Sequence, residues 1–269
     1  MAGLAALAFL APLPARGAGV QGVAVAPPRF ELVLGPGETV SREVAVFARA
    51  PGVDAQTIVP SVVSWSLTPE GNVVVYEQGR SAPPFSAAPW IETAYDPFRL
   101  EPDEPVVVGF QISVPEGTLE GSYYAALAFT TEPRPGEHQG VAVLVNTRML
   151  VIVYATIQGT EQPAAELQGV TVVTDEASGK RYLVADVVNT GNVYLRLNGE
   201  LRFVDSAGEV ARRLELPERV LLREGLVRYR LAFPDDLPGN VILTQIEIQP
   251  QGPAEGYGGP PLYGEAPVR

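Results

Sequence analysis

Few of the residue types that usually carry out catalysis are present in this sequence of 269 residues. There is no cysteine, which excludes disulfides, thiolate metal sites and a cysteine nucleophile together. The single histidine, His138, lies in the proline- and glycine-rich stretch 133–140, which predicts a mobile loop without the rigid support that a catalytic base needs. One histidine also leaves a zinc ion short of nitrogen ligands. We therefore expect no catalytic site, no metal site and no cofactor.

Carboxylates are the remaining candidates for catalysis, since 31 of the residues are acidic. A pair of them could act on a glycosidic bond if the fold held the two at a suitable separation. Most of them, however, occupy predicted turns or alternate outward on predicted strands, as Glu101, Asp103 and Glu104 do. With 19 basic residues the net charge is -12, and no basic stripe interrupts the negative field. The expected partners therefore do not include nucleic acid.

Aromatic side chains suggest a different kind of binding. Trp65, Trp90, Tyr95 and Phe98 could stack on sugar rings, as aromatic side chains do in lectins built on β-sandwiches. An isolated tryptophan in a sandwich strand is more often part of the core. Packing in the core is therefore the favoured role of these residues, and carbohydrate binding is an alternative.

The elements that would position these side chains are predicted to be strands. Residues 106–114 show the pattern most clearly, because every second side chain is apolar. Stripes with this period recur from residue 29 to residue 159 between turns, and the chain contains 27 glycines and 26 prolines. The pattern is typical of half-buried antiparallel sheets. Residues 141–157 are apolar on both faces, so this strand is either covered on both sides or an exposed edge.

The chain divides into segments of different composition. Residues 1–22 predict a cleaved signal peptide, because small-residue cleavage sites follow an apolar stretch. Residues 23–159 and 165–250 each contain enough short strands for one sandwich, with a polar connector between them. Residues 251–269 are rich in glycine, proline and tyrosine and predict a disordered tail. The expected fold is all-β, with two immunoglobulin-like β-sandwich domains in tandem and no membrane span.

Motifs in both halves resemble bacterial proteins of known families. The first half resembles the first domain of periplasmic pilus-assembly chaperones, which share a Trp-Ile pair, a proline-flanked stretch and an alternating strand that ends in proline. The matching segments here are residues 88–91, 97–102 and 108–115. Residues 121–129 are more similar to cell-surface immunoglobulin-like domains, and they place Tyr123 where a tyrosine corner is expected. Residues 188–193 and 199–203 of the second half resemble the same superfamily.

The resemblance implies a non-enzymatic protein that binds a secreted or surface protein subunit in the bacterial periplasm or cell envelope. Pilus chaperones lend an edge strand to an incomplete subunit, and two basic residues in the cleft between their domains hold its terminal carboxylate. The matching basic residues are Arg29 and Arg148, whose guanidinium groups suit carboxylate binding. The partner-binding strand would present Val143, Val145, Leu150 and Ile152.

The same residues leave other interpretations open. Arg29 and Arg148 could pair with surface carboxylates, and the second domain could cover the long strand. The Tyr-Arg-Pro ending of the chaperone donor strand is replaced by residues 153–156, Val-Tyr-Ala-Thr. A permanent structural scaffold of the cell envelope is therefore the alternative function. The sequence does not predict the partner's identity, the angle between the domains or the oligomeric state.

Overall fold

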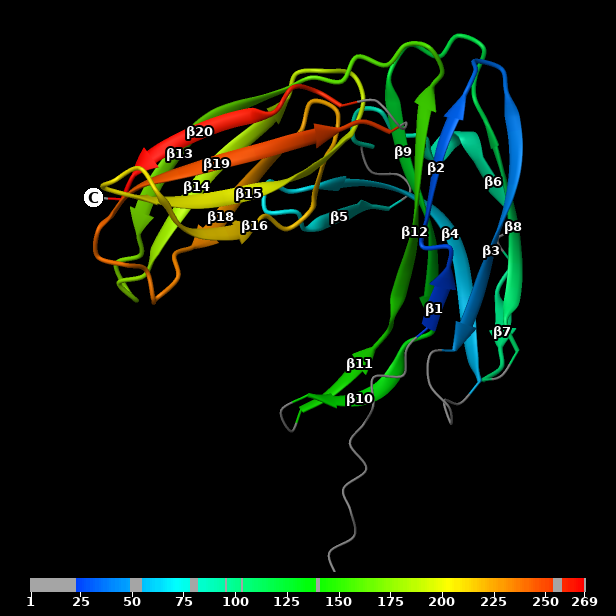
Figure 1. Cartoon of the computed structure of the whole chain (residues 1–269). Helices are drawn as coiled ribbons and strands as arrows, with labels where there is room; N and C mark the ends of the chain where they lie inside the picture. The colour runs from blue at the N-terminus through cyan, green and yellow to red at the C-terminus, as the bar shows by residue number, and fades with distance from the viewer. Residues whose placement is uncertain are drawn as a thin grey trace, which may run out of the picture.

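The computed structural model describes residues 23–48, 55–77, 82–94, 96–102, 104–138, 141–253 and 258–268. The predicted signal peptide lies outside these residues. Figure 1 shows two β-sandwiches that meet at an angle, with a hairpin projecting from the first. The predicted fold class, two tandem immunoglobulin-like sandwiches, is confirmed.

Two sheets form the first domain. The outer sheet has the strand order β1-β3-β8-β6, with bounds Val23–Ala26, Thr39–Ala48, Val106–Ser113 and Ile91–Thr93. The sheet that faces the second domain, called the junction sheet below, has the order β2-β12-β9-β4-β5. Its strands are Arg29–Leu34, Arg148–Ile157, Ser122–Thr131, Gln56–Leu67 and Val73–Tyr76, and β7 (Phe98–Leu100) pairs with β4.

The core of the first domain lies between these two sheets. The alternation predicted for residues 106–114 is confirmed, because Phe110 and Ile112 of β8 are buried whereas Val107 is 60% exposed. The chain leaves the outer sheet after β1 and enters the junction sheet at β2, which runs parallel to β12. Pro27 and Pro28 separate the two strands, where the missing N–H groups suit the end of a ladder.

The long strand predicted over residues 141–157 is instead divided in two. Residues Val141–Val145 form β11, which pairs with β10 (Arg134–His138) in the projecting hairpin. The predicted loop at 133–140 was therefore wrong, since His138 ends a strand. After the break at Asn146 and Thr147, β12 lies between β2 and β9. Its two apolar faces serve the core and the contact with the second domain.

The second domain also consists of two sheets. One has the order β13-β14-β18, with bounds Ala165–Thr174, Arg181–Asn189 and Leu226–Ala232. The other has the order β16-β15-β19-β20, with β17 paired to β15. Its strands are Val210–Glu215, Leu195–Asp205, Val241–Gln251 and Leu262–Pro267, and β17 is Arg219–Leu221.

The prediction of a disordered tail over 251–269 was wrong, because β20 pairs with β19 along its whole length. Ala266 on β20 and Val268 directly after it are both buried, at 2% and 6% exposed. At Gly264 an added Cβ would come within 2.5 Å of the side chains of Leu167 and Val170 on β13. Small inward residues thus let β20 approach β13 and close one side of the sandwich, although they make its apolar pattern weak.

Candidate partner-binding site at the junction of the two domains

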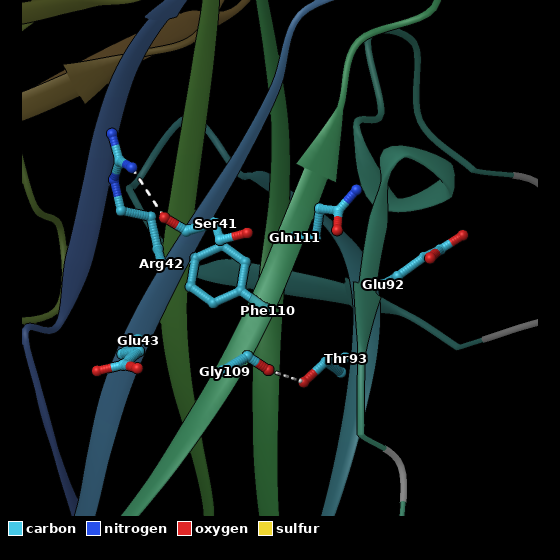
Figure 2. Close-up of a pocket in the computed structure, with 8 residues that line it drawn as sticks. All are labelled: Ser41, Arg42, Glu43, Glu92, Thr93, Gly109, Phe110 and Gln111. Atoms are coloured by element: carbon cyan, nitrogen blue, oxygen red, sulfur yellow. Dashed lines mark hydrogen bonds between the residues drawn. The ribbon is translucent and has the colours of Figure 1, made fainter.

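The outer sheet carries a shallow groove over β3, β8 and β6 (Figure 2). Thr93 donates to the Gly109 carbonyl at 2.9 Å, and Arg42 donates to the Ser41 carbonyl at 2.8 Å. Phe110 is only 4% exposed, so its ring offers no stacking surface. The groove is therefore a polar sheet surface, and none of its lining residues presents an aromatic ring for stacking. It is lined by Ser41, Arg42, Glu43, Glu92, Thr93, Gly109, Phe110 and Gln111.

The aromatic residues singled out in the sequence mostly pack inside the molecule. Trp65 is 2% exposed and donates its indole N–H to the Ala125 carbonyl at 2.9 Å. Trp90 is half-buried against Tyr123, with ring centroids 4.6 Å apart, and Phe98 is also half-buried. Tyr95 lies outside the described residues. Trp65 is thus buried in a cluster that includes residues of the second domain, whereas Trp90 and Phe98 pack against the core of the first sandwich.

The tyrosine corner expected at Tyr123 is also found. Its hydroxyl donates to the carbonyl of Leu119 at 3.3 Å, four residues earlier in the chain. This bond holds the turn before β9, as in other immunoglobulin-like domains.

An apolar contact joins the outer face of the junction sheet to the second domain. Tyr154 of β12 stacks on Tyr194, with ring centroids 4.3 Å apart. Trp65 meets Tyr154 edge-on at 5.8 Å, and Leu222 of the second domain is buried in the same cluster. The second domain therefore covers part of this face, which explains why Leu150, Ile152 and Tyr154 of β12 are apolar.

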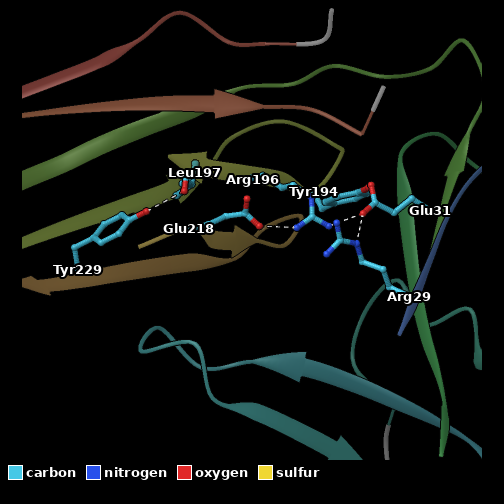
Figure 3. A network of polar contacts seen from close by, with 7 residues as sticks. All are labelled: Arg29, Glu31, Tyr194, Arg196, Leu197, Glu218 and Tyr229. Carbon is cyan, nitrogen blue, oxygen red and sulfur yellow. Dashed lines mark hydrogen bonds and ion pairs between the residues drawn. The ribbon is translucent and has the colours of Figure 1, made fainter. Parts of the chain in front are cut away.

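A charged network lies beside this contact and is centred on Glu31 of β2 (Figure 3). Its Oε1 forms an ion pair with Arg29 Nε at 2.7 Å and accepts a hydrogen bond from Arg196 Nη2 at 2.6 Å. Its Oε2 accepts from the Tyr194 hydroxyl at 2.9 Å. Arg196 also pairs with Glu218 at 3.0 Å. Glu31 thus links one arginine of its own strand to two side chains of the second domain.

The pKa of Glu31 responds to these contacts. Burial by itself would raise the pKa of this carboxyl group. The hydrogen bond from Tyr194 and the charges of Arg196 and Arg29 outweigh burial, so the pKa lies below the ordinary value of 4.5. The group is therefore ionised at neutral pH.

Main-chain contacts fix the angle between the domains. Ser122 donates its amide to the Asn192 carbonyl at 2.9 Å, and Arg223 donates its amide to the Tyr124 hydroxyl at 2.9 Å. The Asn192 side chain accepts from the amide of Gln162 in the connector at 2.8 Å. The connector and the first residue of β9 are therefore part of one interface.

The hairpin of β4 and β5 adds a second set of contacts. The Pro69 carbonyl accepts from the Arg228 amide at 2.8 Å, and the Glu70 carbonyl accepts from the Arg219 guanidinium. The junction is thus held at two places on the second domain.

The two arginines expected to hold a carboxylate lie on the same face of the junction sheet. Arg29 is opposite Ile152 in the register of β2 and β12, and Arg148 lies four residues earlier on β12. Their Cα atoms are therefore about 13 Å apart along the sheet. The structure places Arg29 next to Arg196, not next to Arg148, so the pair of cations that share one carboxylate differs from the expected pair.

Both arginines already have partners within the chain. Arg148 donates through Nε to Thr130 at 3.1 Å and through Nη1 to Glu77 at 2.5 Å. Arg29 uses Nε for Glu31, and its side chain is 54% exposed. In the described part of the chain no hydrogen bond engages the terminal nitrogens of Arg29, so these N–H groups can donate to a further anion.

Of the residues expected on the partner-binding strand, Leu150 lies along an open edge of β12, whereas Ile152 is paired with both β2 and β9. On β12, pairing with β2 begins only at Ile152, so residues 148–151 pair with β9 alone among the described residues. The Ile152 amide donates to Pro28 on the β2 side. Because backbone groups alternate, the Leu150 amide points to the same side, where β1 lies near β12 but no described strand is paired with residues 148–151.

The hairpin continues this edge. Val143 and Val145 belong to β11, which pairs with β10 alone among the described strands. Val141, Leu144 and Val145 are 62%, 74% and 52% exposed. Such a group of exposed apolar side chains next to unpaired backbone is unusual in a folded domain.

Residues that the sequence reasoning missed are Glu31, Tyr194 and Arg196. The period of two does place Glu31 on the same face as Arg29. Nothing in the sequence indicated that Tyr194 and Arg196, more than 160 positions later, would contact that face, because the orientation of the second domain was not predictable.

The described residues contain no helix long and apolar enough to cross a membrane. In the same part of the chain, no three histidine, cysteine, aspartate or glutamate side chains are grouped as metal ligands.

Comparison with known proteins gives matches at the level of structure. No protein-family model matches the sequence, and no curated protein matches it. Among solved structures, the chain is similar to the structure of the Salmonella enterica SafA pilin in complex with the SafB chaperone, with 12% identity and a TM-score of 0.46. This match covers 92% of this chain and 98% of the other.

Two further solved structures show a similar degree of likeness. The E. coli chaperone DraB has 11% identity and a TM-score of 0.45, over 91% of this chain and 98% of the DraB chain. The class 5 fimbriae chaperone CfaA has 10% identity and a TM-score of 0.42, over 88% and 96%. All three likenesses have TM-scores below 0.5 and identities of 12% or less. At these values, function has to be inferred from the side chains of this chain.

Proposed function

We propose that this protein is an exported, non-enzymatic module of the periplasm or cell envelope that holds a secreted or surface protein subunit. The observation that carries the proposal is the open edge formed by β11 and the first residues of β12. Exposed apolar side chains flank unpaired backbone groups there, with Leu144 74% exposed. An extended segment of a partner can pair with such an edge through main-chain hydrogen bonds.

Side chains on this edge would give the pairing its specificity. Val143 and Val145 alternate with Leu144 on β11, so the two faces of the hairpin present different apolar surfaces to a partner. On β12, Leu150 and Ile152 are half-buried on the face toward the second domain. A partner strand with alternating apolar residues would bury these side chains along with its own.

The two arginines lie at places where they could fix the end of such a strand. Arg29 and Arg148 are on the same face as Leu150 and Ile152. A chain end placed between them would bring its carboxylate within reach of one guanidinium, and Arg29 has the unengaged terminal nitrogens. Carboxylate binding would then set the register of the paired strand.

The test is capture from envelope extracts of the source organism with variants that alter only the edge. Leu150→Pro removes the amide that points to the open side, whereas Leu150→Ala shortens the side chain equally but keeps the amide. We expect the proline variant to retain at least tenfold less of the captured subunit than the alanine variant. Equal capture by the two would contradict edge pairing, and a complex that never dissociates would favour a permanent scaffold.

A further inference from the structure

The way in which Arg29 is held suggests a role for Glu31. The ion pair between the two residues joins Glu31 Oε1 to Nε of Arg29 at 2.7 Å, on the inner side of the guanidinium. The terminal nitrogens, which form the fork that binds carboxylates in a bidentate manner, have no partner among the described residues. A second carboxylate can therefore approach Arg29 without displacing Glu31.

The other cations of the junction are less suited to this approach. Arg196 has a side chain that is only 14% exposed, and its two terminal nitrogens already contact Glu31 and Glu218. Arg148 has two of its three nitrogens engaged by Thr130 and Glu77. Arg29 is thus the guanidinium at the junction with a complete unoccupied fork in the described structure.

Glu31 is itself oriented by the second domain. Arg196 donates to Oε1 at 2.6 Å, and the Tyr194 hydroxyl donates to Oε2 at 2.9 Å. These two contacts fix both oxygens, and Tyr194 in turn is fixed by stacking on Tyr154 at 4.3 Å. The orientation of Arg29 therefore depends on the docking of the second domain.

We propose that Glu31 is a positioning residue, which presents the fork of Arg29 to a carboxylate of the bound protein only while the two domains are docked. This inference rests on the proposed function, because it concerns the same binding surface. Without Glu31, the long and exposed Arg29 side chain would sample several rotamers, and a carboxylate would have to order it on binding.

The experiment measures how strongly the protein prefers a peptide with a free terminal carboxylate to the same peptide with a terminal amide. The probes are two fluorescent ten-residue peptides of alternating valine and threonine, one ending in a free carboxylate and the other in an amide. The ratio of their dissociation constants isolates the carboxylate contact from the pairing of the strand. We expect the protein to prefer the carboxylate peptide about tenfold, as charge-assisted hydrogen bonds at a partly exposed site allow.

Three variants separate positioning from general stability. Glu31→Gln is expected to reduce the preference to about twofold while leaving the affinity for the amide peptide within twofold. Tyr194→Phe keeps the stacking on Tyr154 but loses one contact to Glu31, so it should give an intermediate preference. Glu101→Gln is the matched control, because Arg99 Nε contacts Glu101 Oε1 at 2.6 Å with the same spacing of two residues, at the end of β7.

Each outcome decides between the proposals. A tenfold preference that persists in Glu31→Gln would overturn the positioning role while leaving the proposed function intact. Equal binding of both peptides by the unaltered protein would overturn the role of Arg29 itself. If neither peptide binds, edge pairing and therefore the proposed function fail.

Discussion

Gly121 is the position where a single methyl group should disturb the angle between the domains. Its φ is +95°, a region that residues with a Cβ rarely adopt. An added Cβ would lie 2.2 Å from the Asn192 carbonyl oxygen, which belongs to the main chain of the second domain. The backbone conformation costs about 1–2 kcal/mol and the overlap about 1–3 kcal/mol, so Gly121→Ala should cost roughly 2–5 kcal/mol. That is a large part of the typical stability of about 5–15 kcal/mol.

Because the overlapping atom is in the other domain, separation of the domains is the easiest relief. We therefore expect Gly121→Ala to lower Tm and to increase the radius of gyration in small-angle scattering. Gly117→Ala is the control, since Gly117 lies in the same connection and an added Cβ would meet nothing within 4 Å. Indistinguishable values of Tm and radius of gyration for the two variants would refute the view that main-chain contact sets the angle.

Four further outcomes are expected. Deleting residues 259–269 should remove β20 and unfold the second domain, visible as a lost calorimetric transition, whereas a dispensable tail would leave that transition unchanged. Gly264→Val should destabilise the same domain by about 1–3 kcal/mol in urea unfolding, because its side chain would overlap that of Val170, and an unchanged midpoint would contradict this packing. The lowered pKa of Glu31 stabilises the fold above pH 4.5, and this contribution is lost as pH falls through that pKa, so acid should destabilise the unaltered protein more than Glu31→Gln. Burial raises the pKa of Tyr154 to about 12, so the contribution of this tyrosine to folding stability is present below pH 10 and lost between about pH 10 and 12. Tyr154→Phe should therefore reduce the loss of stability in alkaline unfolding.

The fold class was predictable because the physical signal is local. The alternating burial of β8 follows directly from its sequence, and the Tyr123 corner follows from one residue type at one place in a strand. The wrong prediction of a disordered tail has a local cause as well. Gly264 and Ala266 face the interior with little apolar surface, so β20 resembled a disordered segment.

The binding site was predictable only in part because it depends on distant contacts. Arg29 and Arg148 could be placed on one face of a sheet from the alternation of residues. Their separation, and the neighbour that each arginine has, depend on how the second domain docks. The contact of Glu31 with Arg196 is an example, since the two residues belong to different domains.

The parallel pairing of β2 with β12 has a consequence for the order in which the chain can fold. Arg29 meets Ile152 in this register, so one of the first strands to be synthesised must wait for more than a hundred later residues before its partner exists. Contacts between residues so far apart in sequence form slowly. Until then, the junction sheet lacks its last strands, and the nascent first domain exposes the face that later contacts Tyr194. The growing chain therefore passes through a stage at which it exposes an unfilled sheet edge of its own.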